Sequence, residues 1–306
     1  MTTPTPRTDQ VGSTASGIAV LDKPAGWTSH QVVGRVRRLA GTRKVGHAGT
    51  LDPMATGVLV VGINRATRLL GYLSGTSKEY TATIRLGQRT LTDDAEGEVV
   101  SEPGAECRDQ AAIEAALATL RGDIIQVPSS VSAIKIDGVR SYAAVRAGKQ
   151  PELAGRPVHI ERFECLRVSP RQTASGLPVL DLDVEVHCSS GTYVRALARD
   201  LGAHLSTGGH LTALRRTRVG PFSTEQAQTL EQAGESLNLI GLDAVAGRCF
   251  ATVQVDAEQA AWVRNGRRLA QLRLPEEPTA VFDGTGRFLA LYTRNGPDAV
   301  AEAVFV

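Results

Sequence analysis

Alternating apolar and polar residues predict several β-strands with one buried face. The clearest stretch runs from Leu180 to Val186, where every second residue is apolar and the residues between them are acidic. Tyr80 to Leu86 follow the same period of two. Shorter apolar runs at 18–21 and 58–63 also predict strands. The first 190 residues are therefore expected to contain at least four strands.

Apolar residues at helical spacing predict helices between these strands. Ser29 can cap a helix that carries Val32, Val33 and Val36 on one face, and Gly41 ends it. Further helices are expected at 66–73, after a cap at Asp109, near Tyr142 and at 194–201. Asp137-Gly138 is expected to form a turn. Strands and helices alternate without a regular βαβ rhythm.

The two ends of the chain differ from the middle. Residues 1–16 are rich in Thr, Ser and Pro and lack a hydrophobic period, which predicts a disordered tail. An acidic helix and connector are expected between 220 and 247, and a β-rich pattern with Asp283-Gly284 and Asn295-Gly296 turns begins at 253. We therefore predict a main domain at 17–246 and a small β-rich domain at 247–306.

Composition narrows the class of protein. The chain has 306 residues, of which 42% are hydrophobic and 22% charged, so it can bury a core and is not collagen, a coiled coil or a disulfide scaffold. Its four cysteines lie far apart and form no C-x-x-C pair, which favours reduced thiols over a zinc site. No apolar run reaches the length of a membrane span or a signal peptide. A cytoplasmic protein is expected.

Charge is segregated along the chain although the net charge is only +2. Residues 23–51 contain six cations and no carboxylate, whereas residues 93–109 contain seven acids and one arginine. A second basic cluster comprises Arg195, Arg199, Arg215, Arg216 and Arg218, with Asp200 as its single acid. Local clusters of this kind suit a protein that binds a phosphate backbone. Solvated helix faces are the alternative explanation.

The most distinctive motif is Gly46–Gly57, GHAGTLDPMATG. It places one carboxylate, Asp52, among cations and small residues, and Pro53 biases Asp52 toward an extended backbone. An ionised aspartate in this setting can act as a covalent nucleophile, although a simple Asp-Pro turn would have the same sequence. His47 has no second His or Cys at ligand spacing, so no metal site is expected. Signatures of P-loop, Rossmann, zinc-protease and α/β-hydrolase proteins are missing, and S-x-x-K at 132–135 lacks its companion motifs.

Six sequence blocks, in this order, resemble the TruB family of tRNA pseudouridine synthases across most of 17–220. They are KPAGWTS at 23–29, the Gly46–Gly57 motif, KEY at 78–80, SAIK at 132–135, GTYVR at 191–195 and LTALRR at 211–216. The resemblance implies an α+β fold with a mixed, largely antiparallel sheet, a central basic cleft and a small β-rich C-terminal domain. It also implies isomerisation of uridine 55 in the T-loop of tRNA to pseudouridine, without a metal or an organic cofactor.

The resemblance assigns three catalytic residues. Asp52 matches the family's nucleophile, Tyr80 matches an aromatic platform for uracil that can also handle a proton, and Arg195 matches the partner of the nucleophile. His47 matches the residue that fills the gap left by the flipped nucleotide. Whether the aspartate attacks the sugar or relays its proton stays open.

Five further residues match family positions around the substrate. Tyr193 and Leu214 correspond to the pocket wall, and Asp94 to an acidic residue close to the base. Lys23 is expected to be structural or directed at a phosphate, and Lys135 to belong to an RNA-gripping loop. The chain departs from the family pattern at Thr90-Leu91-Thr92 before the acid, at a serine in Val127–Ser130 where a second proline is common, and in its weak match to the usual PUA pattern of the C-terminal domain.

The partner that the resemblance implies is the T-stem-loop of tRNA, bound by a monomer that needs no membrane and no obligate protein partner. Two other functions share some of these features. A non-catalytic RNA-binding protein would use the same basic cleft but has no chemical need for Asp52, Tyr80 and Arg195 together. A glycoside-cleaving enzyme would usually need a second catalytic carboxylate.

Overall fold

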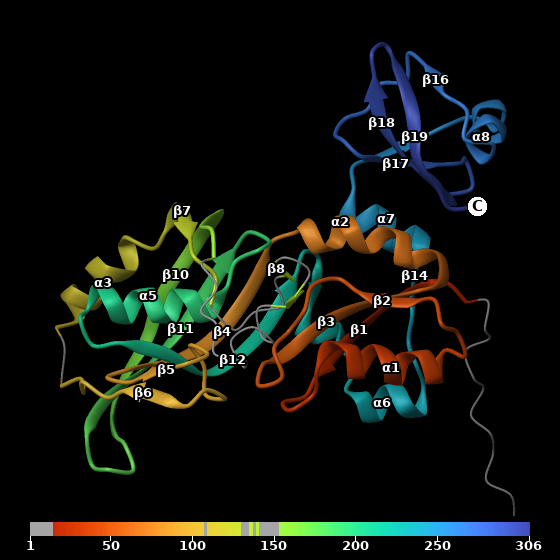
Figure 1. Cartoon of the computed structure of the whole chain (residues 1–306). Coiled ribbons are helices and arrows are strands. Elements are labelled where there is room, and N and C mark those ends of the chain that lie inside the picture. The colour runs from red at the N-terminus through yellow and green to blue at the C-terminus, as the bar shows by residue number, and fades with distance from the viewer. Residues whose placement is uncertain (1–14, 107–108, 130–134, 137–138, 141–152) are drawn as a thin grey trace, which may run out of the picture.

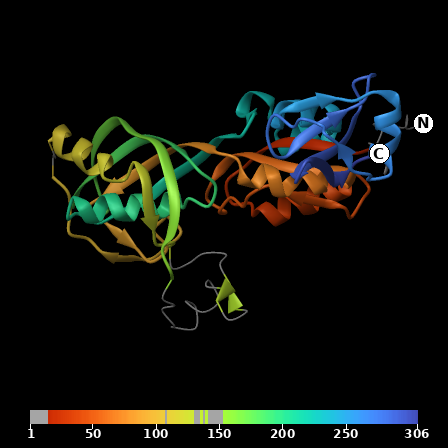
Figure 2. The same cartoon turned by 90° about the horizontal axis from the view of Figure 1, so that it is seen from above.

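A computed structural model describes residues 15–106, 109–129, 135–136, 139–140 and 153–306 (Figure 1), and only the backbone at 135–136 and 139–140. Most of these residues belong to two lobes that share one sheet, and the C-terminal residues form a smaller β-rich domain. Seen from above, the two lobes lie side by side and are joined through the middle of the sheet (Figure 2).

The main sheet has ten strands, and all of its neighbouring strands but one pair are antiparallel. Its order is β14 (Ile240–Gly241), β1 (Gly17–Lys23), β3 (Thr56–Ile63), β12 (Gly209–Val219), β4 (Lys78–Leu86), β11 (Pro178–Cys188), β10 (Arg156–Gln172) and β7 (Gly122–Gln126), with β2 (Val45–His47) added to β3 and β13 (Phe222–Ser223) to β12. The exception is β12 beside β3, which pair in parallel over only two residues. This mixed, largely antiparallel sheet confirms the predicted fold class.

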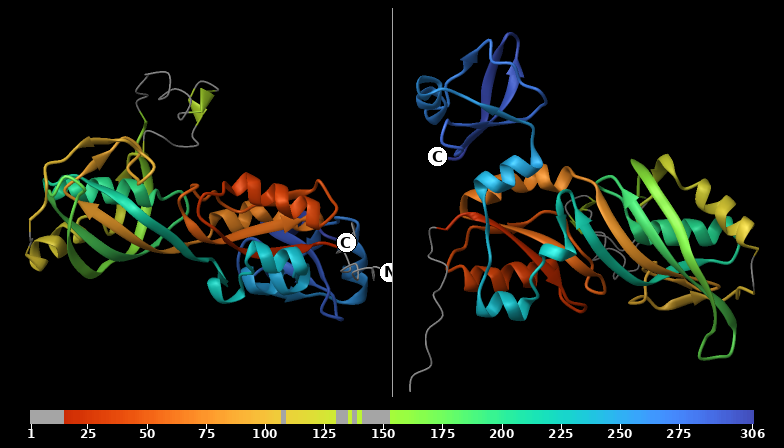
Figure 3. Two further views of the ribbon diagram at one scale, coloured as in Figure 1. Left: turned by 90° about the horizontal axis from the view of Figure 1, so that it is seen from below. Right: turned by 180° about the vertical axis from the view of Figure 1, so that it is seen from behind.

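Helices cover both faces of β1 and β3 (Figure 3). On one side α1 (Ser29–Leu39) and α6 (Leu230–Glu235) pack on Ala19, Leu21, Leu59 and Val61. On the other side lie the 3-10 helix η1 (Asn64–Leu69), α2 (Leu70–Gly75) and α7 (Leu242–Cys249), against the alternate residues of the same strands. A strand enclosed in this way reads as a continuous apolar run, as the sequence does at 58–63.

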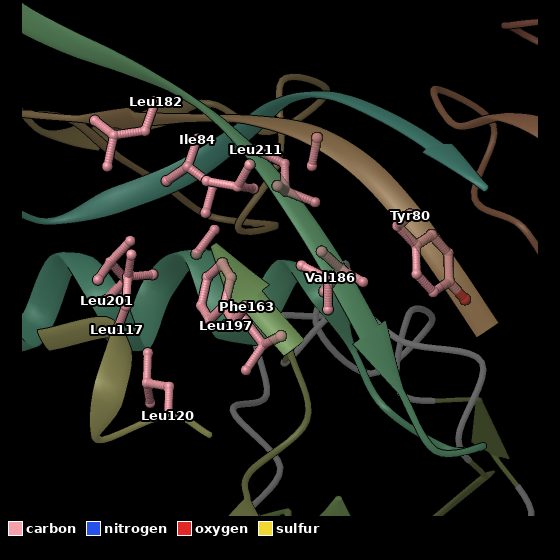
Figure 4. Packing of buried hydrophobic residues seen from close by; sticks show 14 of the residues in the cluster. Tyr80, Ile84, Leu117, Leu120, Phe163, Leu182, Val186, Leu197, Leu201 and Leu211 are labelled. Atoms are coloured by element: carbon pink, nitrogen blue, oxygen red, sulfur yellow. The ribbon is translucent and has the colours of Figure 1, made fainter. Parts of the chain in front are cut away.

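In the other half of the sheet, the helices that the structure describes cover one face. There α3 (Gln110–Ala118) and α5 (Val194–His204) pack on β4, β10, β11 and β12 around a core that includes Phe163, Leu197 and Leu201 (Figure 4). The opposite face carries polar pairs such as Arg85 with Asp181. The strict alternation of β4 and β11 follows from this arrangement.

Two predicted local features can be compared with the structure at α1. Thr28 caps the helix instead of Ser29, through a capping box with Gln31. Ser29 is the first helical residue, and its hydroxyl oxygen accepts a hydrogen bond from Leu51 N and donates one to Leu51 O. Gly41 follows the helix with a φ of 62°, as expected of a residue that ends it. The start of α1 is thus tied directly to the Gly46–Gly57 segment.

The sequence pattern did not predict β10 and β12, two of the three longest strands of the sheet. Both contain bulges, between Ile160 and Arg162 in β10 and between Leu211 and Ala213 in β12. Each bulge shifts the alternation by one residue and hides the period of two. Short pairs β5 (Arg89–Thr90) with β6 (Val99–Ser101) and β8 (Lys135–Ile136) with β9 (Val139–Arg140) complete the strands of this region. The predicted Asp137-Gly138 turn and the helix near Tyr142 lie outside the described residues.

The C-terminal β-domain contains a five-stranded sheet and one helix. Its strands are ordered β15 (Thr252–Gln254), β17 (Thr279–Phe282), β18 (Phe288–Asn295), β19 (Asp298–Val304) and β16 (Leu269–Ala270), and α8 (Ala257–Arg264) packs on the sheet. The two predicted turns join β17 to β18 and β18 to β19. Residue 247 lies inside α7, and the short helix η2 (Thr224–Gln226) precedes α6. Among the residues that the structure describes, no helix combines the length and apolarity needed to cross a membrane.

Candidate active site

A pocket of about 280 Å³ lies at the parallel junction of β3 and β12, where the two lobes meet. Five segments of the chain contribute to it: the loop before β3, the end of α2, the start of β4, the turn that leads into α5 with the first turn of that helix, and the middle of β12. The lining residues include Gly49, Thr50, Leu51, Asp52, Ser74, Lys78, Tyr80, Tyr193, Arg195, Leu214 and Arg216. Five of the nine residues expected from the sequence, Asp52, Tyr80, Tyr193, Arg195 and Leu214, therefore come together.

Asp52 and Arg195 form an ion pair at the wall of this pocket. Arg195 Nε lies 3.0 Å from Asp52 Oδ2, and Nη2 lies 3.4 Å from Oδ1. The Asp52 side chain is 36% exposed, whereas the Arg195 side chain, in the first turn of α5, is only 7% exposed. A charge-assisted pair of this geometry holds the carboxylate in a fixed direction. Asp52 therefore keeps an open side toward the pocket.

Asp94 fixes Arg195 from the opposite side. Its Oδ2 lies 3.3 Å from Arg195 Nη1, which also donates a hydrogen bond to the Thr92 carbonyl at 3.0 Å. Asp94 is 2% exposed and accepts hydrogen bonds from the Thr92 hydroxyl and from Glu96 N. Asp94 is not among the residues that line the pocket. Asp94 therefore lies behind the guanidinium, and its expected closeness to the base stays a prediction.

Lys23 stabilises the backbone around Asp52. Its ammonium donates to the carbonyl oxygens of Pro24, Trp27 and Pro53 at 2.9, 2.6 and 3.1 Å, and the residue is fully buried. Burial lowers the pKa of Lys23 to about 8. Because the ammonium is enclosed by carbonyl groups, the structural role applies and a phosphate contact does not.

Arg216 binds the backbone of the same loop. It was not among the site residues predicted from the sequence. It is 1% exposed and donates to the carbonyl oxygens of Val58, Thr50 and Gly49. Gly57 has a φ of 101°, and a Cβ there would lie 2.1 Å from the Arg216 carbonyl oxygen. Only glycine allows the two strands to approach so closely.

Tyr80 lies where the main core meets the pocket. The residue is 9% exposed, and its hydroxyl points away from the other labelled core side chains (Figure 4). Burial raises the pKa of Tyr80, so the phenol stays protonated at neutral pH. The ring can therefore offer a flat apolar face and a neutral hydroxyl to a ligand.

Lys78 and Gln126 were also not among the site residues predicted from the sequence. Lys78 Nζ donates to the carbonyl oxygens of Ser74 and Thr76, and burial lowers the pKa of this ammonium to about 8. The buried Gln126 side chain accepts a hydrogen bond from Tyr193 N at 2.8 Å and donates to Tyr193 O at 3.1 Å. These partners are backbone groups that the sequence pattern does not single out, so only the folded chain identifies them.

His47 lies beside the pocket and not in its lining. It ends β2, is half-buried, and its ring meets the ring of His30 edge to face at 5.6 Å between centroids. Burial, the neighbouring His30 and Arg216 all lower the pKa of His47. Lys135 belongs to β8, and its side chain lies outside the described part of the chain.

In the second basic cluster, every arginine except Arg216 pairs with a carboxylate, and Arg216 donates to backbone carbonyl groups. Arg199 pairs with Asp93 and Asp200, Arg215 with Asp22, and Arg218 with Glu79. This result differs from both interpretations of the sequence, a phosphate-binding track and a solvated helix face. By contrast, Arg38, Arg43 and Lys44 are exposed and form no ion pair with any residue whose side chain is described. The α1 side therefore carries exposed cations that are not neutralised by a described carboxylate.

Models of three protein domains match residues 37–240 and 250–306 of the chain. The TruB family pseudouridylate synthase N-terminal domain matches 37–194, the tRNA pseudouridylate synthase B C-terminal domain matches 195–240, and the tRNA pseudouridine synthase II C-terminal region matches 250–306.

Curated proteins resemble the chain over nearly its whole length. A tRNA pseudouridine synthase B from Arthrobacter sp. (strain FB24) is 55% identical over 95% of this chain and 96% of its own length. The protein of the same name from Streptomyces coelicolor is 54% identical over 96% and 98%. Among solved structures, a chain in a Cbf5-Nop10-Gar1 complex is 25% identical, with a TM-score of 0.69 over 95% of this chain and 85% of that one. A chain of an H/ACA RNP bound to a substrate RNA is 24% identical, with a TM-score of 0.68 over the same shares.

Proposed function

The chain belongs to the TruB family of pseudouridylate synthases and is a tRNA-modifying isomerase, and from this premise we propose that it acts on uridine 55 of the T-loop with Asp52 as nucleophile. We also propose that it works as a monomer in the cytoplasm, without a cofactor or an obligate protein partner. In this proposal residues 17–246 catalyse the reaction and residues 247–306 add to RNA binding.

The observation that carries the proposal is the half-exposed Asp52 carboxylate, paired with Arg195 inside a pocket that also holds Tyr80. Isomerisation breaks the bond from uracil N1 to the sugar C1′, turns the base and joins C1′ to C5. C5 loses a proton and N1 gains one, so the product has the same atoms as the substrate. Asp52 assists either by attacking the sugar or by relaying one of its protons.

Arg195 holds the Asp52 carboxylate in a fixed direction while the base turns. Asp94 and the Thr92 carbonyl bind the guanidinium on the side opposite Asp52. Arg195 is therefore fixed and does not move with the substrate. Preorganisation of this kind lowers the barrier because no group has to reorient when charge develops. Tyr80 is proposed to stack on uracil, and its protonated hydroxyl is available for hydrogen bonding during the proton transfers.

A nucleotide in a folded T-loop must leave the stack before its glycosidic bond reaches the pocket. The volume of about 280 Å³ is small for a ligand site and suits a single nucleoside. His47, beside the pocket, is proposed to fill the position that the base vacates. Tyr193 and Leu214 would hold the extruded base, and Lys135 would grip the RNA from its loop.

The direct test incubates the purified full chain with a T-stem-loop labelled at its uridines and analyses the nucleosides released after digestion. We expect pseudouridine at position 55 alone, without added metal or cofactor. A matched stem-loop with cytidine at position 55 serves as the control and should yield none.

The same digest separates the alternatives. Free uracil among the products would favour a glycoside-cleaving enzyme. Tight binding of the stem-loop with every uridine left unchanged would favour a non-catalytic RNA-binding protein. Modification at another uridine would contradict the assignment of position 55.

A further inference from the structure

We propose that the exposed face of α1 that begins at His30 is an RNA-binding surface, in which His30 stacks on the unpaired nucleotide beside the extruded uridine. The inference rests on the proposed function, because it names a contact that the same RNA makes at the rim of the same pocket. Three observations support it: the position of His30, the contact of its ring with His47, and the uncovered surface at Gly34 in the helix that follows.

His30 is held rigidly at the edge of the catalytic loop. The residue before it, Ser29, hydrogen-bonds through its hydroxyl to both Leu51 N and Leu51 O, one residue before Asp52. The capping box of Thr28 and Gln31 fixes the same turn of helix. In Figure 1, α1 begins near the middle of the molecule and runs outward from there. An RNA strand whose nucleotide enters the pocket must therefore pass close to His30.

His30 is exposed, and its ring contacts only the ring of His47 among the described aromatic side chains. Its contact with His47 is nearly perpendicular, at 83°, and the residue is exposed. Trp27, three residues earlier, is 36% exposed, and Lys23 fixes its carbonyl. Aromatic residues make up only 4% of the chain, so exposed rings at one rim are an unusual use of them. Unpaired bases stack on rings of this kind in single-strand binding sites.

Gly34 has no side chain, so the helix surface in the next turn after His30 is not covered. A Cβ at this position would meet no heavy atom within 4 Å, so packing inside the protein does not require glycine there. Glycine in a helix interior lowers helix stability relative to alanine. Its use here leaves a low surface between His30 and the exposed Arg37 and Arg38, which follow on the same side of the helix. A sugar-phosphate strand fits over such a surface, with phosphates against the arginines.

The first test measures the affinity of T-stem-loops for variants made in an Asp52→Asn background, which prevents turnover during the measurement. His30→Ala should weaken binding roughly fivefold or more, the loss expected for one stacked base. His30→Phe keeps a ring and should retain most of the affinity, whereas His30→Gln keeps polarity without a ring and should not. His204→Ala, which removes an exposed histidine from the end of α5, is the matched control and should bind normally.

The second test places the stacked base. An abasic nucleotide next to the target uridine should weaken binding to the protein that keeps His30 by about the same factor as His30→Ala does. The same abasic nucleotide should cause no further loss of affinity in the His30→Ala protein. Three results would each overturn the proposal. The first is an unchanged affinity in His30→Ala, and the second is an equal loss of affinity in His30→Phe and His30→Ala. The third is an abasic nucleotide that weakens binding by the same factor in His30→Ala as in the protein that keeps His30. Absence of pseudouridine with the unaltered chain would instead refute the proposed function, and these binding measurements would still be interpretable.

Gly34 provides a variant in which two measurements should move in opposite directions. Gly34→Leu should raise the melting temperature by about 1–2 °C, because leucine favours the helix. It should weaken stem-loop binding severalfold, because the side chain fills the low surface. Binding that is unchanged while the melting temperature rises would show that RNA does not pass over this helix.

Discussion

At the scale of single residues, the site is built from charged side chains whose partners fix them in place. Arg195 neutralises Asp52 on one side and Asp94 on the other, and Lys23 and Arg216 each bind backbone carbonyl groups of the surrounding loop. A buried charge is tolerated because it is paired or fully hydrogen-bonded. The same contacts that stabilise these charges also determine the direction of the Asp52 carboxylate.

Replacing Arg195 should separate catalysis from binding. Arg195→Ala removes the partner of Asp52 and leaves Asp94 buried without its cation, so we expect turnover to fall by about 100-fold or more. Stem-loop affinity should fall much less, because Arg195 is directed at Asp52 and Asp94 and not at the RNA. Single-turnover rates and equilibrium binding measure the two effects. An Arg195→Ala protein with the wild-type rate would refute the role of the guanidinium.

The buried Lys23 ammonium gives a pH prediction with a definite sign. Its pKa is about 8 in the folded chain and near 10.5 when unfolded, so between these values the unfolded chain binds more protons. The contribution of Lys23 to the free energy of unfolding should therefore rise as pH increases from about 8 to 10.5.

Lys23→Met removes this titration and leaves three carbonyl groups without their donor. Urea denaturation of both proteins at several pH values provides the comparison, in which the groups common to both cancel. The stability advantage of the unaltered chain should grow with pH across that window. An advantage that shrinks across it would contradict burial as the cause of the shifted pKa.

At the scale of elements, the sequence pattern predicts the strands and helices whose surroundings are uniform. β4 and β11 alternate because one face is covered and the other is solvated, and β3 is apolar throughout because helices lie on both faces. β10 and β12 escape the pattern because bulges interrupt their alternation. The capping residue of α1 was misplaced by one because Ser29 turns inward to Leu51 instead.

Some residues of the site could likewise be predicted from the sequence and others could not. Asp52, Tyr80 and Arg195 are recognisable because they stand in sequence blocks that match a family. Gln126 stands in no such block, and its partner Tyr193 is brought near only by the fold. Lys78 and Arg216 do stand in matching blocks, but nothing in the sequence pattern indicates that they bind backbone carbonyl groups. A weak signal existed for Arg216, because it ends one of those blocks beside the equally charged Arg215. Sequence alone did not say which of the two turns inward.

The exposed cations near α1 should bind the phosphates of the RNA. Arg38→Gln and Arg43→Gln should each weaken stem-loop binding and reduce the salt slope of the logarithm of the affinity by about one for each phosphate that is no longer neutralised. Arg37 also donates to the Val45 carbonyl, so Arg37→Gln should affect binding and, slightly, stability.

Arg218→Gln is the matched control, because Arg218 is already paired with Glu79. Its salt slope should equal that of the unaltered chain. Should the control change the slope while Arg38→Gln and Arg43→Gln do not, the phosphate track would belong to the second cluster after all.

At the scale of the whole molecule, the C-terminal β-domain is docked on the main domain by its final residues. Phe305 is 3% exposed and packs on Phe288 within a cluster that includes Ala66 and Leu69 of η1. Arg65 donates to the Phe305 carbonyl, and the Arg68 guanidinium lies 4.9 Å from the centre of the Phe305 ring. The cluster is continuous with the core beneath β1 and β3, so the domain is seated on the strands that support the catalytic loop.

Removing this anchor should destabilise the docking and leave the chemistry intact. Phe305→Ala creates a cavity in a packed cluster and should lower the free energy of unfolding by about 3 kcal/mol or more. Arg68→Met, which removes the cation near the ring and a single hydrogen bond, should cost about 1 kcal/mol. Urea denaturation measures both. Turnover of a saturating T-stem-loop should stay near that of the unaltered chain, and a Phe305→Ala protein of full stability would contradict the docking role.

The claim on which the account depends most is that the Asp52 carboxylate performs the isomerisation. The most direct measurement compares single-turnover formation of pseudouridine by the unaltered chain, by Asp52→Asn and by Asp123→Asn, with stem-loop binding recorded for all three. Asp123 is an exposed aspartate on β7, so its variant should convert the stem-loop at the normal rate. The account predicts no detectable pseudouridine with Asp52→Asn and retained binding. Substantial conversion by Asp52→Asn would contradict it.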